Sequence, residues 1–200
     1  MKQFVFLYPI PEIINFEIEN NGWREEGGVD AFREKYKHVL NKCVDIRYRQ
    51  KGFGINWVVF NGSPVSEIIV VQSSDRILEA GIDLKTHRTK QPNGEYPYPD
   101  QDHILDQLNG VTTLRITGFH MWDCVERLAK RAHERGLNTL VDEDLTEFFS
   151  GRLRDPNFNM GEYPTFDPRK SDESMLEMFM EARKEKPWLW QDYSKKIVFK

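Results

Sequence analysis

A strand, a sharp turn and a helix follow one another in residues 112–136, TTLRITGFHMWDCVERLAKRAHERG. The β-branched run 112–117 stops at Gly118, which predicts a buried strand closed by a turn. After the turn, apolar residues recur at helical spacing from Val125 to Ala132, and Gly136 is a typical helix end. A strand that leads directly into a helix is the repeating unit of α/β folds.

The same alternation extends to both sides of this stretch. The pattern predicts strands at 4–8, 55–60, 68–71 and 138–141, helices at 29–50 and 102–109, and irregular chain at 11–28 and 85–101. Residues 76–84 fit a strand or a helix. Strands separated by single helices predict right-handed crossovers, and therefore an α/β fold with a three-layer, doubly wound, mostly parallel sheet.

Composition excludes several classes of protein. The 200 residues include 28 Lys and Arg against 32 Asp and Glu, a formal charge of −4, which disfavours a nucleic-acid-binding protein. No apolar run approaches the roughly 18 residues of a membrane span, and the first residues do not resemble a signal peptide. Two cysteines cannot build a disulfide framework, so we expect a reduced, cytoplasmic setting.

The chain changes character near residue 150. We expect residues 1–150 to form the α/β domain and residues 151–200 to form an extension, with a loop and a helix at 172–186. This extension packs on the core or on a partner subunit. Trp188, Trp190 and Tyr193 would cap a neighbouring subunit's cleft, which favours a homo-oligomer, or would fold onto their own core.

Ligands of open α/β sheets bind beyond the carboxyl ends of the strands, which directs attention to Cys124. Cys124 falls in the first turn of a helix, where unpaired N–H groups and the helix dipole favour a thiolate. The neighbouring negative charge of Asp123 acts against this, because it raises the pKa of the thiol. The alternative is that Cys124 is a small buried apolar residue, as we expect for Cys43. We expect the acidic residues 142–144 and the basic residues 47–51 to be solvated.

The segment 117–125, TGFHMWDCV, resembles the signature of isochorismatase-like cysteine hydrolases, in which Thr-Gly precedes Cys-Val by five residues. The resemblance extends over about 102–149. It implies a six-stranded parallel sheet and hydrolysis of C–N bonds in small amides. It also implies a triad of an Asp after the first strand, a Lys before the Thr-Gly strand, and the Cys, with backbone N–H groups of His120 and Cys124 forming the oxyanion hole.

The sequence departs from this family at the first strand, where Tyr8 stands in place of the Asp. Glu12 or His120 would have to serve as the base. The lysine would be Lys85 or Lys90. The family's metal-binding variant uses an Asp and two His near the first triad residue, and the sequence has no such cluster, so we expect no metal and no cofactor.

Two hypotheses follow. The first is a cysteine hydrolase of a small amide, with Cys124 as nucleophile, Lys85 or Lys90 lowering its pKa, and His120 in the oxyanion hole. The second is a degenerate member of the fold that binds a small molecule or a protein without turnover. We expect a small-molecule ligand to be bound by Tyr8, Asn61, Phe119 and Trp122. A carboxylate on the Cys124 sulfur would favour the enzyme, and an aromatic wall with Tyr8 would favour binding.

Overall fold

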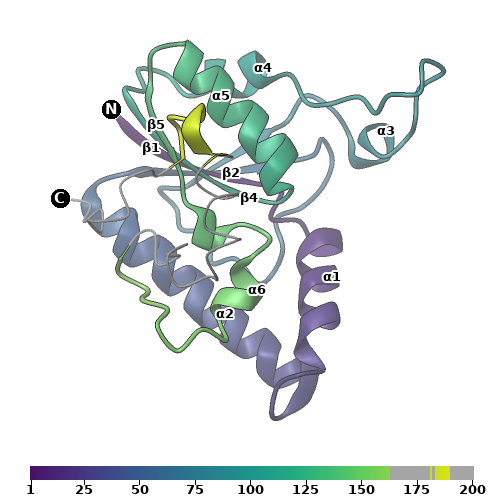
Figure 1. Ribbon diagram of the computed structural model, residues 1–200, viewed down its shortest axis with the longest axis vertical. Helices are drawn as coiled ribbons and strands as arrows, with labels where there is room; N and C mark the ends of the chain where they lie inside the picture. Colours follow the sequence, from purple (N-terminus) through teal and green to yellow (C-terminus); the bar gives the residue numbers. More distant parts are fainter. Residues whose placement is uncertain (163–180, 182, 190–200) are drawn as a thin grey trace.

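Five parallel strands form the centre of the molecule, in the order β3-β2-β1-β4-β5 (Figure 1). The computed structural model describes residues 1–162, 181 and 183–189. The strands are β1 Lys2–Leu7, β2 Gly54–Val59, β3 Arg76–Glu79, β4 Thr113–Gly118 and β5 Asn138–Val141. The α-helices are α1 Pro11–Gly22, α2 Gly28–Arg47, α3 Leu84–His87, α4 Gln101–Asp106, α5 Glu126–Glu134 and α6 Phe149–Arg152.

Helices cover both faces of the sheet. Figure 1 shows α4 and α5 on one face and α1, α2 and α6 on the other. This arrangement confirms the predicted α/β fold with a doubly wound parallel sheet. The family resemblance implied six strands, and the part of the chain that the structure describes has five.

The sheet is buried because its central strands are apolar on both sides. Residues 4–7 of β1 are at most 1% exposed, and Trp57 of β2 is fully buried. The predicted apolar stripe of α2 is buried as well, with Phe32, Tyr36 and Leu40 at most 2% exposed, and Tyr36 packs edge-to-face on Phe149 of α6. Continuous apolar strands of this kind are typical of sheets covered by helices on both faces.

Two stretches differ from the sequence prediction. Residues 11–22, expected to be irregular, form α1, because Pro11 occupies the first helical position, where its missing N–H has no intrahelical partner to lose. The run 68–71, expected as a strand, does not pair with the sheet. Instead the Asn41 side chain donates to the Ile68 carbonyl oxygen at 2.8 Å and accepts from the Val70 N–H at 2.8 Å. The ambiguous stretch 76–84 contributes β3 and then the start of α3.

The residues expected to be solvated at the end of β5 are buried. Arg47 and Asp142 are fully buried and pair at 2.9 Å, and Arg47 also reaches Asp144 at 3.1 Å. Tyr48 donates its hydroxyl proton to Asp142 at 2.5 Å. Glu143 pairs with Arg183. The prediction of a solvated strand end was wrong because partners distant in sequence neutralise each carboxylate.

Residues 183–189 lie against the core of their own chain. The Val141 N–H donates to the Trp188 carbonyl oxygen at 2.9 Å, and Trp188 is 6% exposed. Most of the helix expected at 172–186, as well as Trp190 and Tyr193, lies outside the described residues. The domain division at residue 150, the homo-oligomer and the cytoplasmic setting stay predictions. Within the described part of the chain, no helix is both long and apolar enough to cross a membrane.

Candidate functional site

The candidate site lies where the order of the strands reverses. The chain builds outward from β1 to β2 and β3, then returns to the other side of β1 to form β4 and β5. At the carboxyl edge, Leu7 of β1 is in register with Gly118 of β4. A crevice between two such strands is where ligands bind in open α/β sheets.

Gly118 permits the close approach of the two strands. Its φ is 125°, a value that side-chain-bearing residues rarely adopt. A Cβ built on Gly118 would collide with the backbone of Leu7. The Thr-Gly motif of the sequence therefore has a steric explanation at this position, independent of any chemistry at the site.

Tyr8 follows β1 and fills the position where the resemblance implies an Asp. Its ring stacks on Phe60 with centroids 4.2 Å apart, and its side chain is hydrogen-bonded to Cys124. Tyr8 is 1% exposed and has a φ of 62°. Burial, and then the neighbouring Cys124, raise the pKa of Tyr8 well above its usual value, so the phenol keeps its proton and is the donor.

Cys124 lies in a one-turn π-helix, Met121–Val125, that follows His120. Its Sγ is 3.8 Å from Nδ1 of His120. Cys124 is 4% exposed, and burial, with a further contribution from Asp123, raises the pKa of the thiol to about 12. The effect of burial exceeds the stabilisation of a thiolate that we expected from the helix end.

His120 contacts Cys124 through its ring and Glu147 through its backbone N–H. Its φ of 63° is left-handed, as is that of Tyr8, and these are the two non-glycine residues with positive φ in the described chain. Burial lowers the pKa of His120 below its usual 6.5, so its ring is neutral at neutral pH. Strained residues of this kind cluster at functional sites.

Glu147 occupies one of the two backbone donors that the resemblance assigns to an oxyanion, the His120 N–H. Its Oε2 accepts the His120 N–H at 2.7 Å and the Met121 N–H at 3.1 Å. A developing oxyanion would therefore have to displace a carboxylate from the His120 N–H. Sequence reasoning missed Glu147, because it lies beyond β5 and no motif marks it.

His87 is a second residue that the sequence did not single out. It ends α3, is 8% exposed, and has Nδ1 2.8 Å from the Pro97 carbonyl oxygen. Its ring stacks on Phe60 at 5.1 Å and lies 6.1 Å from the ring of His120. One donor atom each of His87, His120 and Cys124 lie within 4.8 Å of one another.

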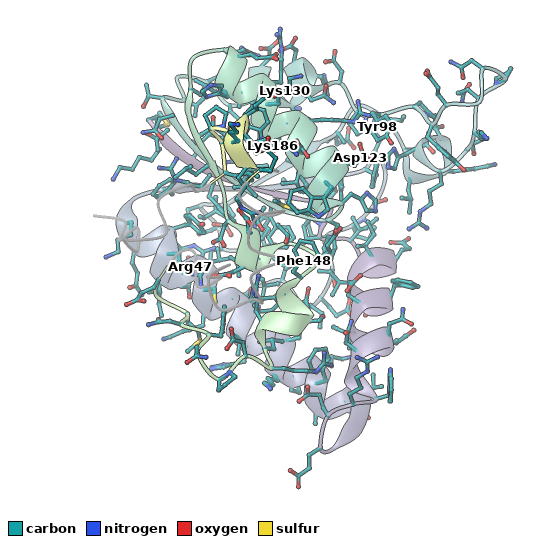
Figure 2. All side chains as sticks on the ribbon, viewed as in Figure 1. Arg47, Tyr98, Asp123, Lys130, Phe148 and Lys186 are labelled. Atoms are coloured by element: carbon teal, nitrogen blue, oxygen red, sulfur yellow. The ribbon has the colours of Figure 1, made fainter. Side chains whose placement is uncertain are left out.

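A cavity of about 480 Å³ opens beside these residues. Its lining consists of His87, Arg88, Tyr96, Tyr98, His120 and Asp123. Tyr98 is hydrogen-bonded to Asp123, and the two lie together at the end of α5 in Figure 2. Arg127 stacks on the Tyr98 ring at 4.0 Å and pairs with Asp123 at 2.6 Å. The cavity thus combines planar rings with charges of both signs.

The structure brings together some of the predicted site residues and separates others. Tyr8 and His120 both contact Cys124. Lys85 and Lys90 are exposed, lie on the arm that projects from the body around α3, and do not line the cavity (Figure 1).

The other three predicted residues have different surroundings. The Oδ1 of Asn61 accepts the Gly81 N–H at 2.9 Å and so joins the chain after β2 to the chain after β3. Phe119 is 2% exposed and packs on Phe6. Trp122 is 44% exposed and lines a different cavity, of about 650 Å³, with Phe148 and Arg183.

Several solved structures have a similar fold. The chain is similar to N-carbamoylsarcosine amidase from Thermoplasma acidophilum, with 20% identity, a TM-score of 0.44, and coverage of 73% of this chain and 84% of that one. It is similar to an isochorismatase family protein, with 17% identity, a TM-score of 0.46, and coverage of 94% of this chain and 95% of that one. It is also similar to the yeast nicotinamidase, with 15% identity, a TM-score of 0.46, and coverage of 100% of both chains.

The family that the sequence resembles is thus also named among the structural matches. No protein-family model and no curated protein matches the sequence. At these identities the likeness concerns the α/β fold, which the order of the strands establishes independently, and it assigns no substrate or site residue to this chain.

Proposed function

We propose that this chain is a divergent isochorismatase-like protein that binds a small planar molecule in the cavity beside His120 and does not hydrolyse it through Cys124. The observation that carries this proposal is the hydrogen bond from Tyr8 to Cys124, at the position where a carboxylate base would stand. The sulfur faces an aromatic hydroxyl where the resemblance implies a carboxylate.

The thiol is not ionised and lacks the lysine that the resemblance implies. A thiol with a pKa of about 12 is ionised to roughly one part in 10⁵ at pH 7. Neither Lys85 nor Lys90 lines the cavity, and Glu147 occupies the His120 N–H. Because loss of one member of a catalytic triad commonly costs about 10³-fold or more in rate, loss of two argues against turnover.

The cavity supports binding of a planar, polar molecule. Its volume of about 480 Å³ suits a small metabolite. Tyr96, Tyr98 and His87 line it with planar rings, and those of Tyr98 and His87 pack edge-to-face on each other at 5.4 Å. Arg88 supplies a cation for a carboxylate, and Asp123 supplies an acceptor for an amide. A nicotinamide-like or nicotinate-like ring has this combination of shape and charge.

One observation favours a second candidate, a hydrolase of the C–N bond of a small amide. The Nδ1 of His120 lies 3.8 Å from Sγ of Cys124, and its neutral ring is able to accept a proton. In this candidate His120 replaces the missing carboxylate as general base.

Calorimetric titration with nicotinamide and with nicotinate, combined with an ammonia assay, separates the two candidates. We expect one of the probes to bind without release of ammonia, and Tyr98→Ala to weaken its binding about tenfold. His38→Ala, an exposed change away from the cavity, should leave binding unchanged. Absence of binding by both probes would overturn the proposal. Ammonia release that disappears in Cys124→Ala would establish the hydrolase instead.

A further inference from the structure

The imidazoles of His87 and His120, which line the cavity, lie close to the thiol of Cys124. From this arrangement we infer that His87, His120 and Cys124 bind one Zn²⁺ ion. The inference goes beyond the proposed function, because the ion would bind whether or not a small molecule enters the cavity. It also differs from the Asp and two His of the family's metal-binding variant.

The distances are close to those of a zinc site. Zinc binds sulfur at about 2.3 Å and imidazole nitrogen at about 2.0–2.1 Å, in tetrahedral geometry. These bonds place a sulfur and a nitrogen ligand about 3.6 Å apart, and two nitrogen ligands about 3.4 Å apart. The Sγ of Cys124 and Nδ1 of His120 are 3.8 Å apart, and all three donor atoms fall within 4.8 Å. The His120 ring borders the open cavity, so the remaining adjustment on binding an ion would fall to this ring.

The surroundings of His87 orient it as a ligand. Its Nδ1 donates to the Pro97 carbonyl oxygen at 2.8 Å, which leaves the lone pair of Nε2 free to bind an ion. Phe60 and Tyr98 hold the ring from two sides. Metal-binding histidines almost always have their second nitrogen fixed by a carbonyl or carboxylate in this way.

Tyr8 supports the third ligand. Its hydroxyl donates to the sulfur of Cys124, and the same bond would stabilise a metal-bound sulfur. The hydrogen bond that argues against a nucleophilic role for Cys124 therefore agrees with a role as ligand.

The donor set selects the kind of metal. Nitrogen and sulfur ligands suit zinc, whereas Ca²⁺ and Mg²⁺ require oxygen ligands. The carboxylates near His120 are Asp123 and Glu147, and the cations are Arg88 and Arg127. Three protein ligands leave a fourth position that opens toward the cavity, as in zinc sites that bind water or substrate.

The test uses the full chain, stripped with a chelator and then titrated with ZnCl₂ or CoCl₂ without any small-molecule probe. We expect about one Zn²⁺ per chain by mass spectrometry of the metal content, and a tetrahedral Co²⁺ spectrum with a sulfur-to-cobalt charge-transfer band. His87→Gln and Cys124→Ser should each weaken zinc binding roughly 100-fold or more, and Cys124→Ser should abolish the charge-transfer band. His38→Gln is the matched control and should bind as the wild type does.

The outcomes separate the inference from the proposed function. Zinc binding that persists in both His87→Gln and Cys124→Ser, or no binding by the wild type, would overturn the metal site. Circular dichroism of each variant shows whether it is folded. If Cys124→Ser does not fold, His120→Gln takes its place, because His120 is partly exposed. This variant should also lose zinc binding and the tetrahedral Co²⁺ spectrum. Binding of nicotinamide or nicotinate to the chelated protein tests the cavity alone.

Discussion

The phenol of Tyr8 is hydrogen-bonded to Cys124, directly beyond the neighbouring ends of β1 and β4. Because Tyr8 is buried and keeps its proton, it stabilises the sulfur as a donor and cannot remove a proton from it. This relationship sets the chemistry of the site, and the predictions below start from it.

Tyr8→Phe should lower the free energy of unfolding by about 1 kcal/mol, because it removes one buried hydrogen bond and leaves the ring in place on Phe60. The measurement is urea denaturation followed by circular dichroism. Tyr96→Phe is the control, because Tyr96 is 48% exposed. Equal effects of the two changes would show that the hydroxyl of Tyr8 does not contribute to stability.

Gly118→Ala should destabilise the protein by about 2–5 kcal/mol, since the new Cβ would both collide with Leu7 and require a strained backbone. Gly136 also has positive φ, 78°, but a Cβ there meets nothing within 4 Å. Gly136→Ala should therefore cost only about 1 kcal/mol. If the two variants unfold at the same urea concentration, the steric explanation of the Thr-Gly motif is wrong.

Arg47→Met should destabilise the fold by about 3–5 kcal/mol, because it leaves the buried carboxylates of Asp142 and Asp144 without their shared cation. Arg131→Met is the contrasting change. Arg131 and Asp102 pair at 2.7 Å, but both are more than 40% exposed, so the loss should be much smaller than that of Arg47→Met. A small effect of Arg47→Met, comparable to that of Arg131→Met, would contradict the buried network.

The pair of Asp102 and Arg131 predicts a defined pH dependence. The hydrogen bond from Arg131 lowers the pKa of Asp102 below its usual 3.8. A carboxyl group with a lowered folded-state pKa stabilises the protein above its usual pKa, and this contribution disappears as the pH falls through the folded-state pKa. The difference in stability between the wild type and Asp102→Asn should therefore be constant from neutral pH to about pH 5 and should vanish in stronger acid. A difference that grows on acidification would have the wrong sign.

The alternation of strands and helices predicted most of the fold, because apolar runs and glycine stops are local signals. The exceptions depend on distant partners. The β-branched run 68–71 has the composition of a strand, but Asn41 of α2 binds its backbone. Residues 11–22, expected to be irregular, form a helix because Ile13, Ile14 and Ile18 bury one side of it.

The site was only partly predictable for the same reason. Cys124 and His120 share one motif, so the sequence pointed to both. His87 and Glu147 come from segments without a motif, and only the strand order carries them to the same edge. The lysines could not be chosen from the sequence, because whether they reach the cavity depends on the path of the arm around α3.

The most direct test of the central claim is the rate at which iodoacetamide alkylates Cys124 in the native protein at neutral pH, read by mass spectrometry. A chelator is present so that bound metal does not protect the sulfur, and the buried Cys43 serves as internal reference. We predict that Cys124 reacts more slowly than a free cysteine until urea unfolds the chain. Alkylation of native Cys124 faster than that of a free cysteine would reveal an activated thiolate and contradict the account.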